Sequence, residues 1–200
     1  MNKPMKRLSL YLFLILFTLP TPSQADDIRD FQIEGMSIGD SLLDYMSEDE
    51  INNSKRDYLK NRKYYVVFIT NSLKDYDVID VYLKSGDKSY EIKTLSGILG
   101  DMNKSQCLSK KKDIVKELDE IFPNIKKIFF NDIPHAFDKT NKSKLYQTGY
   151  LFGKDENENH IRVECSFWTK KMKKKHKFED TLNIVAMTTE IQSWIITDYK

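Results

Sequence analysis

Two groups of strand-like segments organise the hydrophobic pattern of this chain. Apolar, β-branched and aromatic residues dominate residues 64–70, 76–84 and 89–99, and again residues 144–152, 160–168 and 181–187. Turn-forming residues separate the segments, among them Ser85-Gly86-Asp87-Lys88. Such short connections join antiparallel strands, because a parallel pair needs a long crossover. The pattern therefore predicts two three-stranded antiparallel meanders.

A helical period of apolar residues lies between these two groups. Over residues 105–122, the apolar positions that fall on one stripe are Leu108, Val115, Leu118 and Phe122. We predict that Ser105 caps this helix and that Pro123 ends it. Residues 124–143 have no clear period and are predicted to form a packed loop.

Two short helices are expected before the first group of strands. Asp40 is placed to cap a helix over residues 40–46. Ser47 and Glu50 have the spacing of a capping box, in which each side chain bonds the backbone N–H of the other residue. A second short helix therefore follows Ser47.

The order of elements defines the fold class. It is helices, three strands, a helix, three strands and a last helix over residues 189–198, which we expect to bury Trp194 and Ile195. Antiparallel strands followed by segregated helices are typical of α+β proteins. We predict an antiparallel sheet of about six strands, built from the two meanders, with helices packed on one face.

The first 25 residues have the features of an export signal. Their positive residues are Lys3, Lys6 and Arg7. An uncharged stretch follows over residues 8–19, and Ser23-Gln24-Ala25 has the small residues that signal peptidase requires. This stretch is shorter than the ~20 residues that span a bilayer, so we expect cleavage before Asp26 and no transmembrane anchor afterwards. Residues 26–200 would then form a single α+β domain in the periplasm or outside the cell.

The charge balance bears on the expected partners, and the two cysteines bear on whether the chain forms a disulfide. The predicted signal carries three of the 32 basic residues and no acid, which leaves 29 basic and 30 acidic residues. This balance gives no reason to expect a nucleic-acid partner. In an oxidising compartment Cys107 and Cys165 are predicted to form a disulfide, with two buried free thiols as the alternative.

One short motif resembles the signature of the GDSL (SGNH) esterases. Gly39-Asp40-Ser41-Leu42 matches it, and in that family the serine is the nucleophile. The resemblance implies a catalytic triad of Ser41 with Asp132 and His135, which have the family's D-x-x-H spacing. The chain departs from the family because D-x-x-H lies far from the C-terminus and Phe129 occupies a glycine position. Its predicted hairpins also replace alternating parallel strands, and the same tetrapeptide makes a good turn and helix cap.

A cluster of positive charge lies near the C-terminus. It consists of Lys170, Lys171, Lys173, Lys174, Lys175 and Lys177. We consider two interpretations, a surface that contacts anionic lipid or lipopolysaccharide, and a solvated loop between two strands, which is the simpler one. The three histidines, His135, His160 and His176, lack a second ligand at metal-site spacing, so we expect no metal and no cofactor.

Residues 31–51 carry the run Ile-Glu-Gly-Met-Ser-Ile-Gly-Asp-Ser-Leu-Leu-Asp-Tyr. Together with the distant Cys107, this segment resembles uncharacterised small exported proteins of AT-rich bacteria, a resemblance that implies no activity. We therefore favour a non-enzymatic periplasmic binding or interaction protein whose ligand or partner is unknown. The alternative is a serine esterase that uses Ser41.

Overall fold

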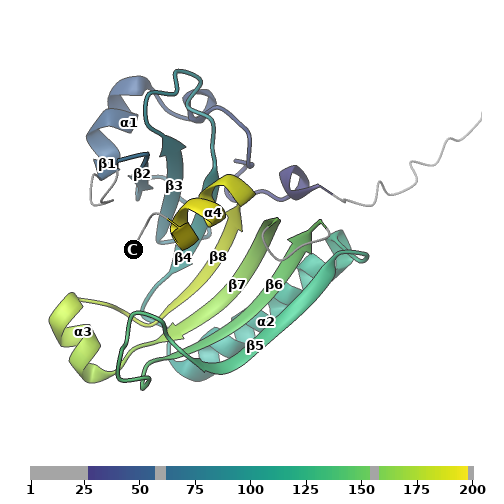
Figure 1. Cartoon of the computed structure of the whole chain (residues 1–200), viewed down its shortest axis with the longest axis vertical. Helices are drawn as coiled ribbons and strands as arrows, with labels where there is room; N and C mark the ends of the chain where they lie inside the picture. The colour runs from purple at the N-terminus through teal and green to yellow at the C-terminus, as the bar shows by residue number, and fades with distance from the viewer. Residues whose placement is uncertain (1–26, 57–61, 154–157, 198–200) are drawn as a thin grey trace, which may run out of the picture.

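The computed structural model contains one eight-stranded antiparallel sheet (Figure 1). It describes residues 27–56, 62–153 and 158–197, and the predicted signal peptide, residues 1–25, lies outside them. The strands are β1 (Lys55–Arg56), β2 (Tyr64–Ile69), β3 (Val78–Lys84), β4 (Thr94–Leu99), β5 (Lys126–Pro134), β6 (Lys144–Phe152), β7 (Asn159–Phe167) and β8 (Thr181–Met187). The predicted α+β class is confirmed, with more strands than expected.

Pairing between β4 and β8 joins the two predicted meanders into one sheet. The order of strands is β1-β2-β3-β4-β8-β7-β6-β5. At the junction, Thr94 pairs with Met187 and Leu99 pairs with Leu182, so the two strands match over their whole shared length. The last strand in the sequence therefore lies at the centre of the sheet.

The strand β5 replaces the loop that we predicted over residues 124–143. Its pairing with β6 shifts register between Phe130 and Ile133, and Asp132 within this bulge has a φ of 56°. A bulge inserts an extra residue into one strand and interrupts the two-residue alternation. This interruption explains why the segment shows no clear period.

Four α-helices accompany the sheet within the described ranges, namely α1 (Glu48–Ser54), α2 (Lys104–Ile121), α3 (Lys170–His176) and α4 (Thr189–Thr197). The capping box between Ser47 and Glu50 at the start of α1 is confirmed. Asn103, and not Ser105, caps α2, because its side chain accepts a hydrogen bond of 3.0 Å from the Gln106 N–H. None of these helices is long and apolar enough to cross a membrane.

The predicted helix over residues 40–46 is wrong. Between residue 27 and α1, the chain forms two single 3₁₀ turns, η1 (Ile28–Asp30) and η2 (Leu42–Asp44). The Asp40 carboxylate accepts a hydrogen bond of 2.8 Å from the Ser37 N–H, and its carbonyl accepts one of 2.9 Å from the Ile92 N–H. The Asp40 side chain is bonded to Ser37, three residues before it, and not to the N–H groups of the turn that follows, so Asp40 does not cap a helix.

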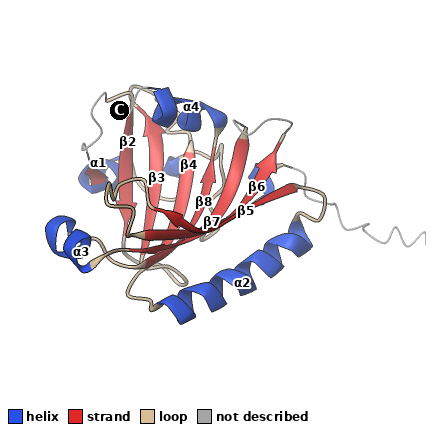
Figure 2. Ribbon diagram, turned by 60° about the horizontal axis from the view of Figure 1, so that its bottom comes forward, coloured by secondary structure: helices blue, strands red, loops and turns tan. Residues whose placement is uncertain are grey.

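Helices pack on both faces of the sheet, and not on one face as predicted (Figure 2). On one face, α2 contributes Cys107 and Leu118 to the main core. On the other, Ile191 and Trp194 of α4 pack with Tyr64, whose ring centre is 5.0 Å from that of Trp194. The predicted burial of Ile195 is also wrong, since it is 38% exposed.

The burial of β8 explains why both faces need a helix. Its residues Leu182, Ile184 and Ala186 belong to the core beneath α2, whereas Val185 and Met187 belong to the core beneath α4. Successive side chains of a strand point to opposite faces. Five of the seven residues of β8 are apolar, and they lie on both faces. Such a central strand is stable only when both of its faces are covered.

The predicted disulfide between Cys107 and Cys165 is present. It connects the first turn of α2 to β7, with Cα atoms 6.1 Å apart, a separation usual for disulfides. Both cysteines are fully buried. The bond therefore fixes the start of α2 against the sheet.

Replacing Cys107 by serine should destabilise the protein. The disulfide joins residues 58 positions apart, and the chain-entropy model assigns a loop of this length about 4 kcal/mol. We expect the Cys107→Ser variant to unfold at a lower urea concentration, with a free energy of unfolding lower by about 4 kcal/mol. An unchanged midpoint would show that the other contacts of α2 hold it against the sheet without the disulfide.

Candidate functional site

The predicted lysine-rich loop is a short helix, α3. Thr169 caps it by accepting a hydrogen bond of 3.3 Å from the Met172 N–H, and Lys177 ends it with a left-handed φ of 57°. Lysine has a good helix propensity, and cations are favourable in the last turn of a helix. The solvated-loop interpretation is therefore wrong about the secondary structure of this segment.

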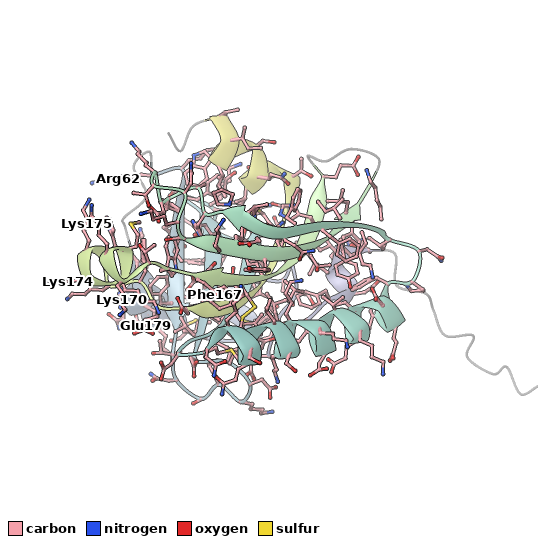
Figure 3. The ribbon with its side chains drawn as sticks, turned by 90° about the horizontal axis from the view of Figure 1, so that it is seen from below. Arg62, Phe167, Lys170, Lys174, Lys175 and Glu179 are labelled. Atoms are coloured by element: carbon pink, nitrogen blue, oxygen red, sulfur yellow. A yellow bond between two sulfur atoms is a disulfide. The ribbon has the colours of Figure 1, made fainter. Side chains whose placement is uncertain are left out.

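The six lysines of residues 170–177 form what we call the α3 lysine cluster. Five of them are exposed, namely Lys170, Lys171, Lys174, Lys175 and Lys177. Lys173 differs, since its ammonium group lies 2.7 Å from the Asp180 carboxylate. Figure 3 shows Lys174 and Lys175 extending away from the body of the molecule. The cluster is thus a projecting positive surface at one end of the sheet.

Four aromatic contacts run beside this cluster. Ring centres are separated by 5.9 Å between Phe137 and His135, 3.9 Å between His135 and Trp168, 4.4 Å between Trp168 and Phe178, and 5.2 Å between Phe178 and His176. We call these five side chains the aromatic row. Its outer member, Phe137, is 64% exposed, and burial lowers the pKa of His135 within the row.

A hydrogen-bond network holds the loop of Phe137 against the start of α3. The carboxylate of Asp138 is buried and accepts bonds from the N–H and hydroxyl of Ser143, at 2.9 and 2.7 Å. It also accepts bonds from Thr140, and these donors hold the pKa of Asp138 well below its usual range. The Ser143 hydroxyl in turn accepts a bond of 3.1 Å from the Thr169 N–H. Loop and helix are therefore connected through polar contacts.

A pocket of about 390 Å³ lies between this loop and α3. Phe137 and Met172 contribute apolar surface, and Lys139, Lys171 and Lys175 contribute positive charge. The only carboxylate in its lining, Asp138, already accepts hydrogen bonds from Ser143 and Thr140. The arrangement suits a ligand with an anionic group and an apolar part.

Other pockets in the described part of the chain have carboxylates beside their lysines. One of about 580 Å³ lies between Tyr76 and α2 and contains three acidic residues and one lysine. Another, of about 510 Å³, lies beside β2 and contains Glu34, Glu50 and one lysine. Their mixed charge defines no class of ligand, so the α3 pocket is the better candidate.

The structure separates the residues of the esterase-like motif. Ser41 forms a bridge with Glu91 just before β4, and its hydroxyl donates a bond of 2.6 Å to the Ser89 carbonyl. The backbone N–H of His135 donates a hydrogen bond to the carbonyl of Ser143, just before β6. This position lies at the end of the strands opposite to the end that carries Ser41. The registers place Ser143 about eight residues beyond the level of Thr94. Strand spacings therefore separate these sites by about 14 Å across the sheet and by more than about 25 Å along it. Asp132 lies 3.5 Å from Lys144 at the bulge of β5, so the three side chains do not form a triad.

Asp80 of β3 is a functional candidate that the sequence did not reveal. Its Oδ1 atom is buried without a hydrogen-bond partner, and burial raises the pKa of this carboxyl to about 7. On the same face of the sheet, Asn183 also has a buried Oδ1 without a partner, and the Nε of Arg162 lies 4.0 Å from Glu164. Between Ile79 and Val81, Asp80 fits the exposed face of an alternating strand. No pattern within β3 indicates that this face becomes partly buried.

Comparison with protein-family models, curated protein sequences and solved structures found no match. Within residues 27–56, 62–153 and 158–197, no three His, Cys, Asp or Glu side chains gather as metal ligands would.

The buried Asp80 should make the protein less stable as the pH rises. A carboxyl with a folded pKa of about 7 and an ordinary value of 3.8 retains its proton more strongly when folded. Stability is therefore lost between about pH 4 and pH 7, by up to about 4 kcal/mol. We expect Asp80→Asn to unfold at a higher temperature than the wild type at pH 8, with a smaller difference at pH 4.

Asp113→Asn provides the matched control, because Asp113 is exposed on α2. This substitution should leave the dependence of the melting temperature on pH unchanged. Equal effects of the two substitutions at pH 8 would contradict the role assigned to Asp80.

Proposed function

We propose that this chain is an exported, non-enzymatic binding protein, and that the α3 lysine cluster and the aromatic row bind phosphate-bearing lipid headgroups at a membrane surface. The observation that carries the proposal is the pocket in which exposed Phe137 lies with Lys171 and Lys175. Positive charge and an exposed aromatic ring in one place suit the boundary between headgroups and acyl chains.

The lysines supply the long-range attraction. A lysine near an anionic membrane contributes about 1 kcal/mol, and contributions of this size add over a cluster of basic residues. The five exposed lysines of the cluster lie within eight consecutive residues. Negatively charged phosphates are among the groups that such a surface attracts.

Phe137 supplies the short-range contact. Its ring is 64% exposed although its loop is held by the bonds of Asp138 and Ser143. Burying a phenylalanine side chain gains about 1.5–3 kcal/mol. Since the loop is already ordered, little of this gain would be lost in fixing its conformation on binding.

The disulfide supports the location that this function requires. The Cys107–Cys165 bond is consistent with an oxidising environment outside the cytoplasm. The predicted signal peptide directs the chain to such an environment, where it would meet the outward leaflet of the inner membrane. Within this proposal the protein acts in the periplasm.

Reversing two charges of the α3 lysine cluster should abolish lipid binding. The test compares sedimentation of the protein with vesicles of phosphatidylglycerol and phosphatidylcholine. Because Lys174→Glu with Lys175→Glu changes the charge by four units, the affinity should fall by more than about 100-fold. Wild-type binding should also vanish near 1 M salt, where the Debye length is about 3 Å.

Matched controls separate this surface from the overall charge of the protein. Lys112→Glu with Lys116→Glu makes the same change on the exposed side of α2 and should retain most of the binding. Pure phosphatidylcholine vesicles should not bind the wild type. If the protein bound lipopolysaccharide but not phosphatidylglycerol vesicles, it would recognise the phosphate groups of lipopolysaccharide and not those of phospholipids. Absence of binding to either lipid at low salt would refute the proposal.

Trp168 provides a spectroscopic readout of the same site. It lies within the aromatic row, whereas Trp194 is a buried residue of α4. Binding near Phe137 should change the fluorescence of Trp168 because its environment becomes less polar. We expect Trp168→Phe to remove the fluorescence response to anionic vesicles. A response that persists in this variant would place the lipid contact elsewhere.

A further inference from the structure

We propose that β5 pairs with β5 of a second copy of this chain, so that two sheets join into one across a two-fold axis. The strand is nine residues long and forms the outer edge of the sheet (Figure 1). Among the described residues, β6 is its only strand partner. An exposed edge of this kind presents free N–H and C=O groups that can pair with another strand.

Exposed phenylalanines on both faces of β5 indicate that the missing neighbour is a strand. The side chain of Lys127 bonds Asp119 of α2 and lies 5.4 Å over the ring of Phe129, which places Phe129 on the α2 face. Phe130 follows it and points to the opposite face. Phe129 is 58% exposed and Phe130 is 41% exposed. A partner docked on one face would cover one ring, whereas an added strand places side chains beside both.

The sequence of β5 favours a second copy as the source of that strand. In an antiparallel pair centred on Phe129, Phe129 lies opposite itself and Ile128 lies opposite Phe130. The same arrangement brings Lys126 of one copy to the bulge that carries Asp132 of the other, at both ends of the seam. Lys126 is exposed, and the Asp132 side chain is 61% exposed. The two-fold axis thus makes the Ile128–Phe130 and Lys126–Asp132 contacts twice, and the Phe129–Phe129 contact once on the axis itself.

The bulge limits the length of this seam. Regular pairing of β5 extends from Lys126 to Phe130, and the register shifts immediately afterwards. Bulges and short edges are devices that restrict edge-to-edge association. Each end of the seam is bounded by Lys126 of one copy and the bulge of the other. Because the two-fold pairing uses the single β5 edge of each copy, it closes as a dimer. At the other edge of the sheet, β1 has only two residues.

Cysteine cross-linking tests the two-fold arrangement directly. Residues that face each other on antiparallel strands have Cα atoms about 4.5–5.5 Å apart, which a disulfide can bridge. We expect Phe129→Cys to form a covalent dimer under mild oxidation. Phe137→Cys is the control, because Phe137 is more exposed but lies outside β5. It should remain monomeric on a non-reducing gel.

Exchange of the two charges tests the register of the seam. Lys126→Glu alone and Asp132→Lys alone each place like charges together at both ends and should dissociate the dimer. An equimolar mixture of these two variants places opposite charges together at both ends. Light scattering after gel filtration should therefore show monomers for each variant and a dimer for the mixture.

Several results would overturn this proposal. A wild-type protein that stays monomeric up to millimolar concentration would do so, as would a Phe129→Cys variant that does not cross-link while Phe137→Cys does. A mixture of the two charge variants that stays monomeric, when the wild type is a dimer, would exclude the pairing centred on Phe129.

Discussion

The pairing of β4 with β8 is the constraint on which the rest of the structure depends. It joins strands from the two halves of the chain along a register that runs from Thr94 and Met187 to Leu99 and Leu182. Without it, the two meanders would be separate small sheets, each with an additional open edge. Because this pairing places a strand with apolar residues on both faces at the centre, one helix is needed on each face. α2 and α4 supply that cover.

The two faces differ in how completely they are stabilised. On the α2 face, the core is large and the disulfide from Cys107 to Cys165 fixes the helix to β7. On the α4 face, polar atoms of Asp80 and Asn183 are buried without partners. A buried polar group that loses water and gains no hydrogen bond costs free energy. This face therefore limits the stability of the protein, and its cost changes with pH because Asp80 titrates near neutrality.

The candidate binding site is formed by connections between strands that meet at one end of the sheet, and not by a single segment of the chain. α3 follows β7, the aromatic row draws side chains from both sides of α3, and Phe137 comes from the loop between β5 and β6. Antiparallel pairing brings these connections to the same end of the sheet. Asp138 and Ser143 then attach the loop to Thr169. The site combines charge from one helix with an aromatic ring contributed by a distant loop.

What the sequence determined by itself was local. The strand β8, the capping box at Ser47 and the disulfide between Cys107 and Cys165 were predicted correctly, because each depends on residue types at short spacing or on the compartment. The lysine cluster was also visible as composition, although its helix was missed because no apolar period marks a short exposed helix. The bulge that hid β5, the burial of Asp80 and the meeting of Phe137 with Lys175 were decided by the tertiary structure. They depend on strand order and register, which arise from contacts between residues far apart in the chain and leave no periodic signal within any one segment.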